Sequence, residues 1–197
     1  MSAMCTDLEL APVKEKYPEA AIVAYVNTSA AVKALADVCC TSANAVKVVG
    51  KLPQKQIIFV PDRNLGAYVQ RFHPEKEILL WPGFCPTHHD ISVEDVNEIR
   101  RKHPRAKLMV HPECTPEVID MADNVSSTEG MIRYAKGSDA LEFIVGTEVD
   151  MTYRLGKEVP GKIFIPVPTA VCPNMKRTTI SSLLKALETL SPEIVLS

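Results

Sequence analysis

Short, continuous apolar runs alternate with amphipathic stretches along most of the chain. Such runs predict strands that are buried on both faces, and the stretches between them predict helices. In the first half, strands are expected at 21–25, 57–60 and 78–81, with a helix at 29–36 and a helical turn at 45–49. In the second half, strands are expected at 107–110, 143–145 and 163–165, with a helix at 116–122. This alternation is typical of parallel sheets covered by helices.

The pattern recurs at a spacing of 86 residues, which indicates an internal duplication. Apolar and chain-breaking positions stay in step: Lys16 with Lys102, Pro18 with Pro104, Val32 with Val118, Asp37 with Asp123 and Ile58 with Ile144. The sequence therefore predicts an α/β fold of two repeated three-layer αβα units with parallel sheets. We expect the units at 14–99 and 100–186, between an N-terminal segment 1–13 and a C-terminal segment 187–197. Residues 192–196 resemble a strand that opens another unit.

Two cysteines end the two units in the same way. Cys85 and Cys172 are each followed by proline and then by a polar stretch, 91–95 or 178–181, that predicts a helix start. The same spacing predicts a third cysteine near the chain start, where Cys5 is the only candidate. Three thiolates at equivalent ends of repeated units would meet on a pseudo-threefold axis, where they can bind a four-iron cluster with one open iron. Duplicated core cysteines are the alternative interpretation.

Polar residues stand at the end of the first predicted strand of each unit. In the 86-residue repeat, Tyr25 is equivalent to His111 and Asn27 is equivalent to Glu113. Ligands of open α/β sheets bind beyond the carboxyl ends of strands, so these side chains are candidates for substrate orientation and proton transfer. The alternative for each is a loop residue bonded to backbone.

Hydroxyl residues precede a predicted helix in both units. In the repeat, residues 41–44, which include Ser42, are equivalent to residues 127–130, which include Thr128. Helix N-termini bind phosphate or carboxylate, so the two stretches predict an anionic substrate. Plain N-capping is the alternative.

His88 and His89 follow Cys85 at a spacing seen in zinc sites, but no second ligand pair matches them, so zinc is not favoured. Cys39 and Cys40 are expected to pack at the end of a helix-like stretch.

Charge and composition exclude several classes of protein. The 197 residues hold 22 Lys and Arg against 24 Asp and Glu, a net charge of −2, which argues against a nucleic-acid or membrane-surface partner. The longest apolar run, 20–26, is too short to span a bilayer, and the N-terminus does not predict a signal peptide. We therefore expect a cytoplasmic protein that binds neither nucleic acid nor membrane.

As a set, seven stretches resemble the quinolinate synthase family. They are YVNTSAAVKALADVCCTSANAV, PDRNLGAYVQ, WPGFCPTHHDI, HPEC, MADNVSSTEGMI, GTE and PTAVCPNMK. The resemblance implies three similar αβα units around a [4Fe–4S] cluster, and the condensation of iminoaspartate with dihydroxyacetone phosphate to quinolinate for NAD biosynthesis. It implies an iminoaspartate-producing enzyme as a partner.

The resemblance also implies roles for single residues. Cys85 and Cys172 would be cluster ligands, with Cys5 as the candidate third. Substrate contacts would come from Tyr25, Asn27, Ser42, His111, Glu113 and Thr128. Of these, Glu113 and His111 would move protons and Tyr25 would orient the substrate.

The chain departs from the family pattern in two ways. The first of the three units has no counterpart, so the pseudo-threefold arrangement lacks one unit. Around Cys5 the sequence continues Thr6-Asp7-Leu8, and the spacer to Tyr17 is six residues shorter than that from Cys85 to His103. Two alternative functions follow: a non-catalytic remnant of the family that binds anions or dicarboxylates, and a metal-free module that binds a small dicarboxylate or phosphate.

Overall fold

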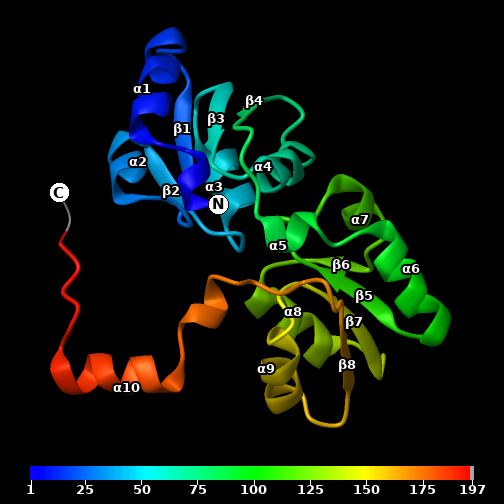
Figure 1. The fold of residues 1–197 in the computed structure, drawn as a ribbon. Coiled ribbons are helices and arrows are strands. Elements are labelled where there is room, and N and C mark those ends of the chain that lie inside the picture. The colour runs from blue at the N-terminus through cyan, green and yellow to red at the C-terminus, as the bar shows by residue number, and fades with distance from the viewer. Residues whose placement is uncertain (196–197) are drawn as a thin grey trace.

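The computed structural model describes residues 1–195, which form two separate four-stranded parallel sheets with helices on both faces (Figure 1). The first sheet has the strand order β2-β1-β3-β4. Its strands are β1 (Ala21–Tyr25), β2 (Val38–Cys40), β3 (Gln56–Val60) and β4 (Glu77–Leu80). One face packs on α1 (Asp7–Lys16) and α2 (Ala30–Leu35), and the other on α3 (Ala45–Lys51) and α4 (Arg63–Gln70). A short 3₁₀ helix, η1 (Ser2–Met4), precedes α1.

The second sheet repeats this order as β6-β5-β7-β8. Its strands are β5 (Lys107–Val110), β6 (Asn124–Val125), β7 (Glu142–Gly146) and β8 (Ile163–Pro166). One face packs on α6 (Val93–Lys102) and α7 (Pro116–Asp120), and the other on α8 (Thr128–Gly137) and α9 (Met151–Glu158). The short helix α5 (Pro86–His89) lies where the two units meet (Figure 1). The predicted fold class is confirmed, while the residue boundaries of the units stay predictions.

The duplication is confirmed in the hydrogen bonds of the two sheets. The Asp37 carboxylate accepts the backbone N–H of Ile22 at 2.7 Å, and Asp123 accepts that of Leu108 at 2.8 Å. Both pairs are 15 residues apart, and each ties the loop before an edge strand to the central strand. The strand pairing follows the same 86-residue repeat, since Ala21 pairs with Ile57 in one sheet and Lys107 pairs with Phe143 in the other.

Three helices begin with the same N-cap device. Thr6, Ser92 and Thr179 cap α1, α6 and α10 (Ile180–Thr189), each in a reciprocal capping box with the residue three positions later. The helix starts predicted after Cys85 and Cys172 are therefore confirmed. Because the caps are 86 and 87 residues apart, they define the repeat independently of the strands.

The C-terminal part departs from the pattern. After β8 the chain forms a 3₁₀ turn, η2 (Met175–Arg177), and α10, which lies away from both sheets (Figure 1). The strand predicted at 192–196 is absent from residues 192–195, and its last residue lies outside the part of the chain that the structure describes. A strand needs a neighbouring edge, and none lies beside this segment within residues 1–195. No helix in that range is long and apolar enough to cross a membrane.

Candidate functional site

Two adjoining cavities lie between the units, where strands of both sheets end. The larger, about 430 Å³, is lined by Cys85 and Cys172, and the smaller, about 380 Å³, by Tyr25 and His111. The residues that line both are Asn27, His88, Glu113, Glu148 and Met175. Strand carboxyl ends expose side chains of many loops to one crevice, so the location is the expected one for a ligand.

The smaller cavity brings together the six side chains proposed above to contact substrate. Tyr25, Asn27, Ser42, His111, Glu113 and Thr128 all line it. They come from the carboxyl end of β1, the loops after β1, β2 and β5, and the start of α8, so both units contribute. The Ser42 hydroxyl lies 3.1 Å from His111 Nε2 and joins the units directly. Tyr25 accepts a hydrogen bond from Asn27 Nδ2 at 2.9 Å, and burial raises the pKa of its phenol so that it stays neutral.

Glu113 is the centre of the polar network. It is 2% exposed, and its Oε2 lies 2.9 Å from His88 Nδ1 and 3.1 Å from His111 Nδ1. Burial alone would raise the pKa of Glu113, but the two imidazoles more than offset this and lower it to about 2. The carboxylate is therefore ionised at neutral pH.

The two imidazoles beside Glu113 differ in charge. Burial opposes a charge on His88, yet hydrogen bonds to Cys85 and Glu113 raise its pKa to about 10. Burial, together with the charge on His88, lowers the pKa of His111. The rings stack with centroids 4.6 Å apart, so one protonated imidazole beside one neutral imidazole is the arrangement that this geometry favours.

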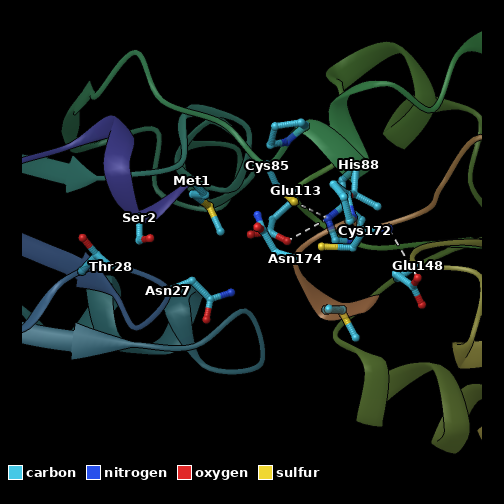
Figure 2. Close-up of a pocket in the computed structure, with 14 residues that line it drawn as sticks. Met1, Ser2, Asn27, Thr28, Cys85, His88, Glu113, Glu148, Cys172 and Asn174 are labelled. Carbon is cyan, nitrogen blue, oxygen red and sulfur yellow. Dashed lines mark hydrogen bonds and ion pairs between the residues drawn. The ribbon is translucent and has the colours of Figure 1, made fainter. Parts of the chain in front are cut away.

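Cys85 and Cys172 have equivalent surroundings. The backbone N–H of Cys85 donates to Asp62 at 2.8 Å, and that of Cys172 donates to Glu148 at 3.4 Å. Asp62 and Glu148 are themselves 86 residues apart in the repeat. Both thiols are partly exposed at the wall of the larger cavity (Figure 2). Two soft, accessible thiols in one cavity fit iron–sulfur ligation in donor type and position.

The structure does not bring Cys5 to this cavity. Cys5 is 1% exposed and packs with Leu10, Ile22 and Val60 in the core of the first unit. Burial raises the pKa of its thiol to about 11. Cys5 comes one residue before the cap Thr6, which is the place of the buried core residue Ile91 before Ser92. Its role as a ligand stays a prediction that this packing does not support.

Several site residues were missed by sequence reasoning. His88 points at Glu113, whereas His89 points toward Arg63 and Asn64, so of the two adjacent histidines only His88 lies beside Glu113. Asn64 Nδ2 donates to the Glu113 carbonyl at 2.9 Å across the units. Arg154 lines the smaller cavity with its guanidinium bound to Glu129. The spacing from Cys85 marked His88 only as a zinc candidate, and no local motif marks Asn64 or Arg154, because their partners lie far away in sequence.

The adjacent cysteines Cys39 and Cys40 differ in burial. Cys40 is buried in the first core, as predicted, whereas Cys39 is exposed. They lie in strand β2 and not at a helix end, which corrects the predicted setting. Successive strand residues point to opposite faces, and this explains the difference.

Comparison with known proteins agrees with these features. The family model described as "Quinolinate synthetase A protein" matches residues 1–197. The chain belongs to this family. It is 55% identical over 175 residues to a quinolinate synthase of Thermodesulfovibrio yellowstonii, covering 88% of the chain and 58% of the relative.

Two further relatives give the same picture. Quinolinate synthases of Caldicellulosiruptor saccharolyticus and Methanoregula boonei are 50% and 51% identical over 95% and 98% of the chain. The alignments cover 62% and 64% of those relatives, so the chain spans about three fifths of their length. The family resemblance drawn from the sequence is therefore confirmed.

Proposed function

We propose that the chain supplies most of a quinolinate synthase active site, which condenses iminoaspartate with dihydroxyacetone phosphate to quinolinate for NAD biosynthesis. The observation that supports this best is the convergence of the site residues. Six candidate substrate contacts line one cavity, and two candidate cluster cysteines line the cavity beside it. We place the reaction in the cytoplasm, where reducing conditions keep Cys85 and Cys172 as thiols.

Cys85 and Cys172 would hold a [4Fe–4S] cluster. When bound, the cluster supplies a Lewis-acidic iron that polarises a substrate oxygen. Each cysteine is fixed by a backbone N–H bond to a carboxylate, Asp62 or Glu148, which holds the thiol at the cavity wall.

The chain's own residues would handle protons and orientation. Glu113, ionised and buried, accepts a proton from carbon or nitrogen during the dehydrations that close the pyridine ring. His88 Nδ1 holds the Glu113 carboxylate in place, and the neutral Tyr25 phenol donates a hydrogen bond to developing negative charge. Ser42 keeps His111 in place across the units.

The phosphate of dihydroxyacetone phosphate would bind in the smaller cavity beside Thr128 and Arg154. Thr128 is the first residue of α8 and lines the cavity, so the N-terminus of that ten-residue helix lies at this wall. Arg154 adds a guanidinium on the same cavity. These donors would stabilise the negative charge that develops on the phosphate group as it leaves.

Quinolinate formation after anaerobic reconstitution with iron and sulfide tests the proposal, with iminoaspartate generated in situ. Glu113→Gln should lower the rate by about 10²–10⁴-fold, because general base catalysis is worth that much. The exposed Glu117, four residues on, gives the control Glu117→Gln. Equal rates for the wild type and Glu113→Gln would contradict the role of Glu113.

The assay is run with and without a chain that carries the first αβα unit. Since the chain spans about three fifths of its relatives, orientation of the substrate is expected to be incomplete without that unit. We expect the 197-residue chain alone to be at least about a hundredfold slower, which corresponds to roughly 2.7 kcal/mol. Full turnover by the chain alone would contradict this expectation.

The alternative is a non-catalytic module that binds an anion or dicarboxylate. The observation in its favour is that only two thiols line the larger cavity among residues 1–195. It predicts calorimetric binding of a dicarboxylate that is lost in Arg154→Ala and unchanged by Cys85→Ser or by iron. Quinolinate formation in the complemented assay would exclude it.

A further inference from the structure

The segment that follows Cys172 is tied to the second unit by one lysine. Lys176 lies four residues after the cysteine, and its backbone N–H donates to the Cys172 carbonyl at 3.1 Å, which closes one turn. The Lys176 ammonium lies 3.2 Å from Glu148 Oε1 and also pairs with the Asp150 carboxylate. Glu148 Oε1 is the same atom that accepts the Cys172 N–H at 3.4 Å (Figure 2). The cysteine and the lysine are therefore joined through one carboxylate oxygen.

The first unit has an equivalent tie without the ion pair. The N–H of His89, four residues after Cys85, donates to the Cys85 carbonyl at 2.9 Å. The His89 ring nitrogen Nδ1 lies 3.3 Å from Asn64 Nδ2. In the repeat, Asn64 is equivalent to Asp150, and His89 follows its cysteine at the same spacing as Lys176. The turn after each cysteine is thus held at the same place in both units, by different residue types.

The burial of Glu148 makes this lysine more than a surface charge. Glu148 is 6% exposed, whereas the side chains of Lys176 and Asp150 are 40% and 68% exposed. Lys176 is the only cation that pairs with Glu148 within residues 1–195. The other hydrogen bonds of Glu148 come from the backbone N–H groups of Asp150 and Cys172. Because a buried carboxylate without its cation is costly, removal of the ammonium should draw Glu148 toward water and release the Cys172 N–H.

We propose that Lys176 is a positioning residue that holds Cys172 at the wall of the larger cavity and Met175 between the two cavities. Met175 lines both cavities and directly precedes the lysine, so the same tie fixes both residues. Lys176 itself lines neither cavity and acts through Glu148 and Asp150. The proposal rests on the proposed function in one respect, that Cys172 is a cluster ligand.

Hydrogen exchange of the reduced, metal-free 197-residue chain tests the tie without any cluster. Peptides that span 172–177 report the N–H groups of Cys172 and Lys176. Lys176→Met keeps the length of the side chain but removes its charge, and should speed exchange in this segment by at least about threefold. Lys176→Arg should restore the wild-type rate. The exposed Arg177, the next residue, gives the control Arg177→Met, which should exchange like the wild type.

Ionic strength separates an electrostatic tie from simple packing. Since Lys176 and Asp150 are partly exposed, salt should screen their attraction. Exchange in 172–177 of the wild type should become faster between about 0.1 M and 1 M NaCl, whereas that of Lys176→Met should stay constant. Equal exchange in the wild type and Lys176→Met, or failure of Lys176→Arg to restore the rate, would overturn the proposal. Faster exchange in β7 of Lys176→Met would also overturn it, because the effect would then be a global loss of stability.

Iron release separates this proposal from the proposed function. After anaerobic reconstitution with iron and sulfide, Lys176→Met should lose iron to a ferrous chelator at least about threefold faster than the wild type, and Lys176→Arg should lose it at the wild-type rate. Equal release from the wild type and Lys176→Met would overturn the positioning of Cys172. A wild type that binds no iron would contradict the proposed cluster, while hydrogen exchange would still decide whether Lys176 holds the segment.

Discussion

Leu10 and Leu183 occupy the same position in two equivalent helices, yet Leu10 is fully buried and Leu183 is 54% exposed. Each lies four residues after a threonine cap, Thr6 in α1 and Thr179 in α10. Leu10 packs on the first sheet, and no sheet within residues 1–195 covers α10. The same local sequence signal therefore leads to different packing, because only one of the two helices has a sheet beside it.

This difference predicts opposite effects of one substitution. Leu10→Ala should lower the free energy of unfolding by about 2–5 kcal/mol, because it leaves a cavity in a closed core. Leu183→Ala should change it by less than about 0.5 kcal/mol, because the side chain is already in water. Urea unfolding followed by circular dichroism measures both. A large loss in Leu183→Ala would mean that α10 packs on the rest of the chain.

The two candidate cysteine ligands in the first unit should respond differently to serine. Cys5→Ser should lower the free energy of unfolding by about 1–3 kcal/mol, because it buries a hydroxyl in an apolar core, and should leave the iron content unchanged. Cys85→Ser should lower the iron and sulfide content of anaerobically reconstituted protein. Iron analysis of the two folded variants measures this, with Cys39→Ser as the control. Loss of iron in Cys5→Ser would restore Cys5 as a ligand.

Thiol reactivity provides an independent check of the same placement. The thiolate is the nucleophile, so a buried thiol with a raised pKa reacts slowly with iodoacetamide. With its pKa raised to about 11, Cys5 should stay unmodified at pH 8, whereas the exposed Cys39 is modified. Mass spectrometry of peptides after timed labelling of the native protein distinguishes the two sites. Equal labelling of Cys5 and Cys39 would mean that the first core opens readily.

Asn64 should couple the two units. Its side chain is 5% exposed and donates to the Glu113 carbonyl, so Asn64→Ala leaves that buried carbonyl without its donor. The expected loss of unfolding free energy is about 1–3 kcal/mol. The exposed Asn97 on α6 gives the control Asn97→Ala, for which a change below about 0.5 kcal/mol is expected. Matching urea midpoints for the two variants would show that the Asn64 bond contributes nothing.

The repeat carboxylate Asp123 should contribute an acid-sensitive part of the stability. Burial raises the pKa of Asp123, but hydrogen bonds from Lys107 and from the Leu108 N–H more than offset this and lower it below its ordinary value. A carboxyl whose pKa is lower in the folded state stabilises the fold above its ordinary pKa and loses this contribution as the pH falls. The difference in unfolding free energy between the wild type and Asp123→Asn should therefore shrink from pH 6 to pH 3. A constant difference across this range would contradict the prediction.

The sequence by itself determined the elements and their repetition. Buried parallel strands are continuous apolar runs, so β1, β3, β5 and β7 were predicted to within a residue or two. The edge strands β2 and β6 were missed, because β2 has only three residues at the end of a helix-like stretch and the two residues of β6 carry no apolar run. Residues at or just after the strand ends, such as Tyr25 and His111, were identified as candidates because the carboxyl ends of parallel strands share one edge.

Only the tertiary structure decided which of these residues meet. His88 and Glu113 are 25 positions apart and Ser42 and His111 are 69 apart, and each pair forms only because the fold brings the two residues together, Ser42 and His111 from different units. Cys5 matched the cysteine pattern, yet its place before a helix cap directs it into the core. Hydrophobic periodicity is local information, which fixes the face that a residue takes within its own unit. The contacts between units depend on how two rigid sheets pack, and the spacing of residues along the chain does not encode that packing.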